Sequence, residues 1–316
     1  MADPLVSVVI PTRNRPARLE RLLASLRAQT LSQAQFEVIV VDDGSGVETG
    51  GVIAAEAVRG ELRLSAVRHP VALGPAAARN SGWRAAAAPL VAFTDDDCVA
   101  SPDWLREVVG VHAKAPGSII QGPTRPDPGE LDQAGPFSRT LHVEQLGPQY
   151  ETCNIVYPRM LLEALGGFDE TFGPGPTAED TDLAWRAIET GGRTVFASEA
   201  VVFHAIERLG ALGMLRVATR WTAAVGVLAR YPAVRSSLYR GRFWNVWHYL
   251  LWRSLLVLAA PAWLRRLVLT RHLLALNERA AALGGSPATI PFLLVHDAVE
   301  CWAVARGALR YRTLVL

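Results

Sequence analysis

The chain has 316 residues, of which half are hydrophobic and a fifth are charged, and its net charge is +2. This length exceeds that of one ordinary domain, and the composition excludes a disordered chain, so we expect a large globular unit with an appendage. Three widely spaced cysteines argue against a disulfide framework and favour a reducing, cytoplasmic setting. The first residues show no basic stretch followed by an apolar run, so we expect no signal peptide.

Charge is divided unevenly along the chain. Residues 205–316 hold 15 arginines against four acidic residues, a net charge of +11, which leaves −9 for residues 1–204. An acidic half suits a divalent cation, whereas a basic, Trp-rich half suits an anionic surface such as lipid headgroups. Nucleic acid would suit the basic half on charge alone, but no recognition motif accompanies it, so we expect no nucleic-acid partner.

The first part of the chain alternates between strand and helix patterns. Strands are predicted at residues 5–10, 36–42, 62–67 and 90–94, and helices at residues 19–26, 52–58 and 76–88. Strand, helix, strand is the order of a parallel crossover unit. We therefore predict an α/β domain at residues 1–204 with a Rossmann-like, mostly parallel sheet flanked by helices.

The later part of the chain changes in character. Residues 121–150 are rich in Pro and Gly and predict an irregular connection, and a second such loop is predicted at Gly173–Pro176. Helices at 158–165 and about 178–190 and short strands at 194–197 and 200–203 follow. Beyond residue 204 the composition predicts a mainly α-helical C-terminal region at residues 205–316.

The C-terminal region contains an apolar run of 11 residues at 254–264. A membrane-spanning helix needs roughly 20 apolar residues, so this run is too short to cross a bilayer. Two interpretations stay open. The region attaches peripherally to the anionic inner face of the cell membrane, or it packs on the first domain or on a second subunit of a homo-oligomer.

Polar clusters follow three of the predicted strands. In parallel sheets ligands bind at the carboxyl ends of strands, so the clusters should meet at one crevice. Three adjacent carboxylates repel one another, and a hard divalent metal holding a diphosphate would relieve that repulsion. The plainer alternative for the acidic run is a solvated turn. The clusters are Pro11, Thr12, Arg13 and Asn14, then Asp42 and Asp43, then Asp95, Asp96 and Asp97.

Three further residues are candidates for the same crevice. Asp43 would accept hydrogen bonds from a base or ribose, or it simply forms an Asp-Gly turn. Arg79 lies on a predicted helix facing the crevice, where its forked donors suit a diphosphate, or it is a surface arginine. His204 ends a strand and is either a third metal ligand beside Asp97 and Asp95 or a structural histidine.

A general base is predicted at the start of the helix near residue 179. Asp180 would deprotonate an acceptor hydroxyl, with Asp182 as a rival, although acidic residues also begin helices for electrostatic reasons. Cys153 has no base near it in sequence, so covalent catalysis is not supported. Candidate acceptor contacts are Cys153 and Asn154, expected before a helix, together with Glu179, Asp182 and Trp185.

Six motifs in this order and spacing resemble those of the family 2 glycosyltransferases, which have the GT-A fold. The resemblance covers about residues 5–204. In many relatives a small residue separates the two aspartates of the DxD motif, whereas this chain has Asp96 there. The motifs are Val8–Asn14, Asp42–Ser45, Arg79–Gly82, Asp95–Asp97, Gly166–Glu170 and Glu179–Arg186.

The resemblance implies inverting transfer of a sugar from a nucleoside diphosphate sugar, most commonly a UDP-sugar, to an acceptor hydroxyl. It implies Mn²⁺ or Mg²⁺ as the cofactor. By likeness, Pro11, Arg13 and Asp43 hold the nucleoside, Arg79 contacts the donor, Asp95 and Asp97 bind ribose and metal, Asp180 is the base, and His204 lies near the metal.

Two other functions fit the sequence less well. A sugar-nucleotide nucleotidyltransferase would carry a Gly-rich basic loop after its first strand, where this chain has Pro11–Asn14. A scaffold with a decayed donor site would not need the full set of carboxylates. The acceptor is expected to be a glycan or a lipid-linked hydroxyl.

Overall fold

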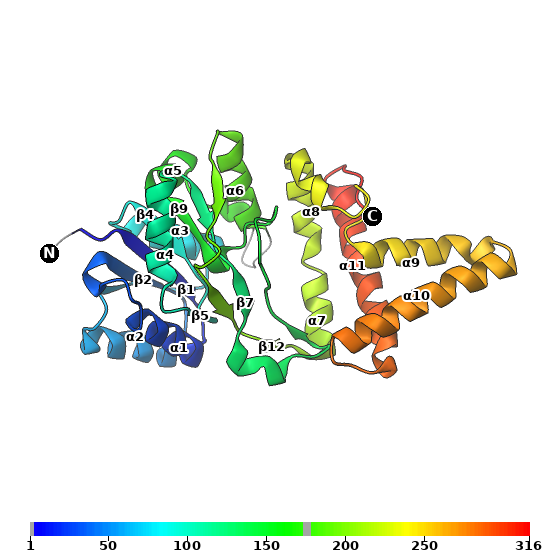
Figure 1. Cartoon of the computed structure of the whole chain (residues 1–316), viewed down its shortest axis with the longest axis horizontal. Coiled ribbons are helices and arrows are strands. Elements are labelled where there is room, and N and C mark those ends of the chain that lie inside the picture. The colour runs from blue at the N-terminus through cyan, green and yellow to red at the C-terminus, as the bar shows by residue number, and fades with distance from the viewer. Residues whose placement is uncertain (1–2, 173–177) are drawn as a thin grey trace. The chain divides into compact units, whose positions relative to one another are not determined.

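A computed structural model describes residues 3–172 and 178–316, so the predicted loop at Gly173–Pro176 lies outside the described residues. The chain forms two compact units (Figure 1). The first contains residues 1–129 and 140–205, and the second contains residues 130–139 and 206–316. The segment 130–139, which the sequence analysis assigned to the first domain, therefore has its contacts with the C-terminal residues.

The first unit is built on a seven-stranded sheet. Its order is β10-β6-β9-β4-β1-β2-β3, and every neighbouring pair is parallel except the two pairs that β9 makes. The mostly parallel sheet predicted from sequence is thus confirmed, while the antiparallel β9 was not predicted. The strands are β1 (Val6–Thr12), β2 (Phe36–Asp43), β3 (Leu64–His69), β4 (Leu90–Phe93), β6 (Ile119–Gln121), β9 (Ile155–Pro158) and β10 (Thr194–Phe196).

Helices cover both faces of this sheet. One hydrophobic cluster joins Val8 and Ile10 of β1 to helices on one side, and another joins Val9 to helices on the other. Burial on both faces explains why β1 and β2 are continuous apolar runs. The first face carries α1 (Pro16–Arg27), α2 (Val47–Arg59) and α4 (Trp104–Lys114), and the second carries α3 (Pro75–Ala85), α5 (Arg159–Leu165) and α6 (Glu179–Glu189).

Helix α3 approaches the sheet unusually closely at Gly82. A Cβ atom at this position would overlap Val9 Cγ1 and press on Val41 Cγ2. Glycine therefore lets the backbone of α3 rest directly on β1 and β2. This close packing sets the position of Arg79, one turn earlier in α3, relative to the carboxyl ends of β1 and β2.

A smaller sheet positions His204. It has the order β5-β11-β7 and contains β5 (Cys98–Ala100), β7 (Thr124–Pro126) and β11 (Val202–His204). β11 runs antiparallel to β5 with His204 opposite Cys98, so the histidine lies beside the end of the acidic run. The segment 121–150, predicted to be irregular, contains β7 and the two-residue β8 (Ser138–Arg139).

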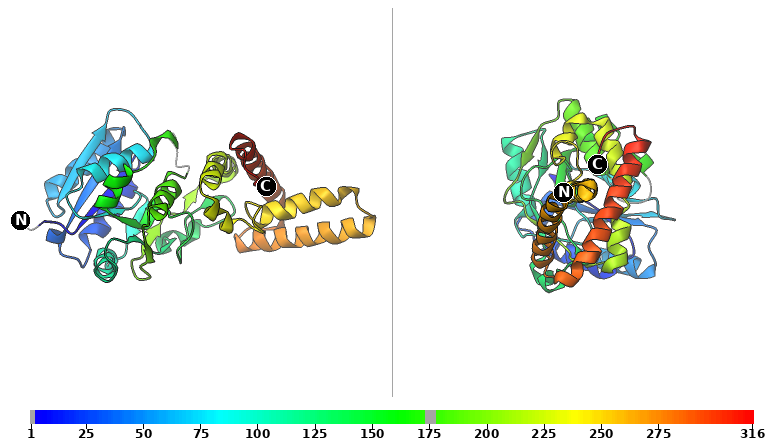
Figure 2. Two further views of the ribbon diagram at one scale, coloured as in Figure 1. Left: turned by 90° about the horizontal axis from the view of Figure 1, so that it is seen from above. Right: turned by 90° about the vertical axis from the view of Figure 1, so that its right-hand side faces the viewer.

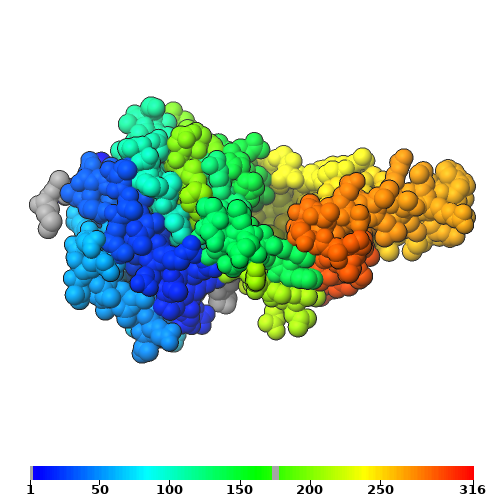
Figure 3. All heavy atoms as spheres, turned by 60° about the horizontal axis from the view of Figure 1, so that its bottom comes forward, coloured from blue at the N-terminus to red at the C-terminus, as the bar shows by residue number. Residues whose placement is uncertain are grey.

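The second unit is mainly helical, as predicted. The short strand β12 (Glu207–Arg208) pairs with β8, and α9 and α10 form a hairpin that projects from the rest of the unit (Figures 2 and 3). The apolar run 254–264 is divided between the end of α9, a 3-10 turn and the start of α10. The helices are α7 (Gly210–Ala218), α8 (Trp221–Arg230), α9 (Val246–Leu256), α10 (Ala262–Ala282) and α11 (Ile290–Arg310).

One helical segment of the described chain has the length and composition of a membrane span. It covers residues 287–310, with a mean hydropathy of 1.3, and 39% of its most apolar stretch is buried within the structure. The segment includes α11, which contacts α7, α8, α9 and α10. Helices at the centre of a bundle satisfy the same criterion, so length and composition alone do not identify a span.

Candidate active site

The carboxyl ends of β1, β2 and β4 lie at one edge of the large sheet, and their polar residues are joined by hydrogen bonds. Thr12 Oγ1 donates to Asp96 Oδ2 over 2.8 Å, which links β1 to the acidic run after β4. The backbone N–H of Asn14 donates to Ser45 Oγ over 3.0 Å, which links β1 to the loop after β2. The three clusters therefore form one continuous site.

The three aspartates of the acidic run have different environments. The side chain of Asp95 is 25% exposed, whereas those of Asp96 and Asp97 are 7% and 8% exposed. Arg15 donates to Asp96 Oδ1 at 3.2 Å and to Asp97 Oδ2 at 2.7 Å. Burial raises the pKa of Asp96 to about 6, although Arg15 opposes the shift. The carboxylate of Asp96 is thus bound by Thr12 and Arg15, and Asp95 is the most exposed of the three aspartates.

Asp97 Oδ1 and His204 Nε2 lie close together at the end of the acidic run. Asp97 Oδ1 is buried without a hydrogen-bond partner, and it lies 3.6 Å from His204 Nε2. His204 Nδ1 lies 2.8 Å from the carbonyl oxygen of Ala205, to which it can donate, so in the neutral imidazole Nε2 is the acceptor. Two atoms each about 2.1 Å from one ion would be about 3.0–3.6 Å apart. The pair therefore fits a divalent metal.

Arg79 bridges two carboxylates from distant parts of the chain. Its Nη2 donates to Asp95 Oδ1 at 2.8 Å and its Nη1 donates to Glu179 Oε1 at 2.9 Å. The arginine and Glu179 are both buried. Burial opposes the charge of Arg79, but the charges of Asp95 and Glu179 outweigh burial and raise its pKa above the ordinary value. The guanidinium thereby ties α3 and α6 to the acidic run.

Asp43 is engaged by its own chain. Its Oδ1 lies 2.7 Å from His69 Nδ1 and accepts the N–H of Leu73 at 2.8 Å, while Oδ2 accepts the N–H of Gly74 at 2.9 Å. Burial alone would raise the pKa of Asp43, but these hydrogen bonds outweigh it, so the pKa lies below its usual value. Asp43 consequently anchors the turn that begins α3.

Asp180 lies in an acidic neighbourhood at the start of α6. Burial, together with the charges of Glu179 and Glu151, raises the pKa of Asp180 to about 8, despite the opposing effects of Arg79 and of the Thr181 N–H. Burial also raises the pKa of Glu151, whose Oε2 accepts a hydrogen bond from Gln121 Nε2 at 3.2 Å. A carboxylate with a pKa near neutrality suits general base catalysis.

Four residues considered as acceptor contacts serve the fold in this structure. Cys153 and Asn154 are buried and precede strand β9, not the helix expected from sequence. The Asn154 amide donates to Pro123 O and Ala200 O, each at 2.8 Å, and accepts from the Trp104 indole. Asp182 accepts Arg186 Nε at 2.7 Å, and the Trp185 indole donates to Pro148 O.

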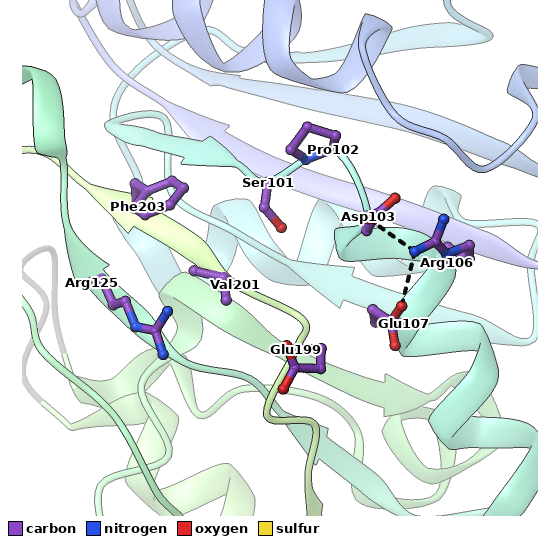
Figure 4. Close-up of a pocket in the computed structure, with 9 residues that line it drawn as sticks. All are labelled: Ser101, Pro102, Asp103, Arg106, Glu107, Arg125, Glu199, Val201 and Phe203. Atoms are coloured by element: carbon purple, nitrogen blue, oxygen red, sulfur yellow. Dashed lines mark hydrogen bonds and ion pairs between the residues drawn. The ribbon is translucent and has the colours of Figure 1, made fainter.

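Among the cavities in the described part of the first unit, two are of interest. One of about 270 Å³ is beside the predicted nucleoside residues and is lined by Asn14, Pro16, Gly46, Val47, Glu48 and Thr49. Pro11 is partly buried next to this loop, and Arg13 is exposed. The other, of about 360 Å³, lies along β5, β11 and the start of α4 and contains none of the predicted site residues (Figure 4).

Three residues of the candidate site were not predicted from sequence, namely Arg15, Glu151 and His69. Arg15 was the easiest to find, because a basic residue follows Pro11–Asn14 and three carboxylates were expected beside that loop. Glu151 lies in a Pro/Gly-rich segment without periodicity, so nothing in sequence connected it with Asp180. His69 ends a strand, as His204 does, but its carboxylate partner comes from the neighbouring strand.

Comparison with known families gives two overlapping matches. The profile described as Glycosyl transferase family 2 matches residues 7–165. The profile described as Glycosyl transferase family group 2 matches residues 90–296 and so extends into the helical unit.

Curated relatives are about one third identical to this chain within the aligned part. Validoxylamine A glucosyltransferase of Streptomyces hygroscopicus subsp. limoneus is 34% identical over an alignment of 218 residues that covers 58% of this chain and 48% of the relative. Pre-mycofactocin glycosyltransferase of Mycobacterium tuberculosis is 34% identical over an alignment of 214 residues that covers 63% of this chain and 42% of the relative. The chain thus spans about half the length of the curated relatives it matches.

Solved structures share the fold at lower identity. The mannosyltransferase PcManGT from Pyrobaculum calidifontis, in complex with GDP-Man and Mn²⁺, aligns with a TM-score of 0.69 and 20% identity over 96% of this chain and 88% of its own. TarS 1-349 of S. aureus in complex with UDP aligns with a TM-score of 0.56 and 20% identity over 98% of this chain and 92% of its own.

Proposed function

Because the chain belongs to glycosyl transferase family 2, we propose that it transfers a sugar from a UDP-sugar to an acceptor hydroxyl with inversion at the sugar carbon. That it is a glycosyltransferase follows from the family; the donor, the stereochemistry, the metal and the acceptor are the proposal. Membership of the family also removes the main reason to consider a nucleotidyltransferase or a non-catalytic scaffold.

The observation that carries the proposal is the pair formed by Asp97 and His204. Asp97 Oδ1 is buried, has no hydrogen-bond partner and lies 3.6 Å from His204 Nε2. These two atoms, with the partly exposed Asp95, would hold Mn²⁺ or Mg²⁺, and the imidazole favours Mn²⁺. When bound, the metal neutralises charge on the diphosphate leaving group. The Mn²⁺ bound by the structurally similar mannosyltransferase supports the assignment.

The nucleoside is assigned to the loops after β1 and β2. Residues Pro11, Thr12, Arg13 and Asn14 adjoin the cavity of about 270 Å³ there. Asp43 already accepts three hydrogen bonds, and a carboxylate has about four lone-pair sites, so one remains for a base or ribose. UDP and UDP-GlcNAc in complexes of TarS support a uridine donor, while GDP-Man in PcManGT is the competing precedent.

Asp180 is proposed as the general base of a single in-line step. The acceptor oxygen forms a bond to the anomeric carbon, the bond from that carbon to the diphosphate oxygen breaks, and the hydroxyl proton passes to Asp180. The raised pKa of about 8 makes the carboxylate a stronger base. Its rival Asp182 is fully buried against Arg186, which supports the choice of Asp180.

We further assign the α9–α10 hairpin to the inner face of the cell membrane, which would bring a lipid-linked acceptor to a cytoplasmic enzyme. Leu256 and Trp263 near its tip are 75% and 69% exposed, and Arg265 and Arg266 adjoin them. Apolar tips beside arginines suit anionic lipid. Flotation with anionic vesicles at low salt tests this assignment. Failure of the protein to float would favour a second subunit as the partner.

The test of the proposed activity is a screen of UDP- and GDP-sugars for hydrolysis with Mn²⁺, with Mg²⁺ and with EDTA. We expect release of UDP that stops with EDTA and returns with Mn²⁺. His204→Ala should raise the Mn²⁺ concentration for half-maximal activity by about 10- to 100-fold, the usual cost of losing a metal-site residue. His142→Ala, an exposed histidine outside the proposed site, is the matched control. Activity that survives EDTA would remove the metal from the proposal.

A further inference from the structure

A second group of ligand-type side chains lies in the helical unit. His296, Asp297 and Glu300 are carried by α11, and one donor atom from each lies within 4.8 Å of the other two. All three side chains are buried. His296 and Glu300 are four residues apart, so they project from the same face of α11, as paired ligands on a helix do.

His248 meets this group from α9. Its side chain is fully buried, and its Nε2 lies 3.5 Å from Glu300 Oε2. Neither ring nitrogen of His248 has a hydrogen-bond partner within the described residues, and Nδ1 of His296 also lacks one there. A buried polar group left without a partner is destabilising. Coordination of a cation would use these free nitrogen lone pairs.

The charges around the group are not balanced by its protein neighbours. Arg279 Nη1 donates to Asp297 at 2.8 and 3.0 Å and so compensates that carboxylate. Glu300 accepts from Trp221 Nε1 at 2.9 Å and from Asn245 Nδ2 at 3.4 Å, and both of these donors are neutral. With neutral histidines the group therefore retains one buried negative charge, which calls for a cation or a proton.

We propose that His296, Asp297 and Glu300 form a binding site for a divalent transition-metal ion, and that His248 of α9, which lies 3.5 Å from Glu300, closes on the ion as it binds and so joins α9 to α11. Two imidazoles and a carboxylate are a ligand set of Zn²⁺, whereas Mg²⁺ and Ca²⁺ prefer oxygen ligands. The site shares no residue with the Asp97–His204 pair. Its role is to stabilise the helical unit, because metal binding to a folded site adds to folding stability.

The experiment uses the full-length chain carrying Asp97→Asn and His204→Ala, so that the proposed catalytic metal does not contribute. After EDTA treatment and dialysis, Zn²⁺ and Co²⁺ are titrated separately by calorimetry. We expect about one equivalent of Zn²⁺ to bind and the melting temperature to rise by about 5 °C or more at saturating metal. Bound Co²⁺ should give the visible absorption of a low-coordinate nitrogen–oxygen site.

Ligand variants in the same background locate the ion. His248→Ala and, separately, His296→Ala should weaken Zn²⁺ binding at least tenfold and remove the thermal shift, while His142→Ala, an exposed histidine of the first unit, should change neither. The Co²⁺ spectrum of the parent protein decides the matter if His248→Ala fails to fold. Absence of Zn²⁺ binding, or binding that both variants retain, would overturn the proposal and leave a protonated His248 as the partner of Glu300.

Discussion

Arg79 Nη2 donates to Asp95 Oδ1 over 2.8 Å, and the other terminal nitrogen of the same guanidinium reaches Glu179. This bridge joins α3, the acidic run and α6 through one buried cation. It also means that a single side chain holds both the donor side and the acceptor side of the proposed reaction. The position of Asp180, next to Glu179, depends on it.

Replacing Arg79 should therefore cost stability as well as activity. Arg79→Met leaves Glu179 buried without its cation, and breaking a buried pair from one side costs about 3–5 kcal/mol. The free energy of unfolding, measured with urea, should fall by that amount. Arg84→Met, an exposed position on the same helix, should change it by less than about 0.5 kcal/mol. Adding Glu179→Gln to Arg79→Met should restore part of the loss, and no recovery would mean that the charges are not the cause.

The close contact between α3 and the sheet gives a second prediction. In Gly82→Ala the new methyl group would overlap Val9 Cγ1. Overpacking of this kind costs about 1–3 kcal/mol, which urea unfolding would measure. Val9→Ala removes the opposing methyl groups, so the double variant should be more stable than the sum of the two single effects predicts. Strict additivity would show that α3 moves away from the sheet without strain.

The alternation of strand and helix in residues 5–94 was sufficient to predict the parallel core, because β1 and β2 are long buried runs, each with a clear helix after it. The antiparallel β9 was missed for a physical reason. Four residues ending in Pro158 carry too little periodicity to distinguish a strand from the start of a helix. β5 and β7 have three residues each and raise the same difficulty.

The residues of the proposed site were likewise predicted from sequence only in part. Residues at or shortly after the ends of strands, such as Asp43 and Asp97, were found because strand ends in a parallel sheet share one edge. What sequence did not reveal is which atoms are already used. Asp96 is held by Thr12 and Arg15, whereas Asp97 Oδ1 is free, and this difference depends on side-chain contacts across more than 80 residues.

The pH dependence of transfer gives a third prediction. The proposed base, Asp180, would act only when ionised, and burial with the charges of Glu179 and Glu151 raises its pKa to about 8. The value of kcat/KM should therefore rise about tenfold per pH unit below that pKa and level off above it. Glu151→Gln removes one of the negative charges, so the rise should shift to lower pH. Glu189→Gln, an exposed carboxylate at the far end of α6, is the control.

The raised pKa of Asp180 also makes the free energy of unfolding depend on pH, and this quantity falls with rising pH where the activity rises. Because the folded-state pKa of Asp180 is raised above the usual value of 3.8, the folded chain binds more protons than the unfolded chain between the two values. Asp180 therefore contributes stability at low pH that is lost as the pH rises through about 8.

An unchanged pH–rate profile in Glu151→Gln would contradict the prediction for kcat/KM. It would mean that Glu151 does not act on the base, or that the base is another residue.

Arg15 gives the last prediction, because it occupies the place where a cation is needed. Its Nη1 lies 2.7 Å from Asp97 Oδ2, and its side chain is 42% exposed. If the proposed metal binds Asp97, Arg15 competes with it for the same carboxylate. Arg15→Ala should therefore tighten Mn²⁺ binding in the absence of donor by about 2- to 5-fold, since an exposed ion pair contributes up to about 1 kcal/mol.

Calorimetric titration of Mn²⁺ into the donor-free protein measures this effect, and Arg63→Ala, a half-exposed arginine beside Glu37, is the matched control. Donor binding should change in the opposite direction, because Arg15 is then missing as a cation for the diphosphate. Weaker Mn²⁺ binding in Arg15→Ala would contradict the prediction that Arg15 competes with the metal. It would mean that Arg15 positions Asp97 for the metal, and that the two cations act together at one carboxylate.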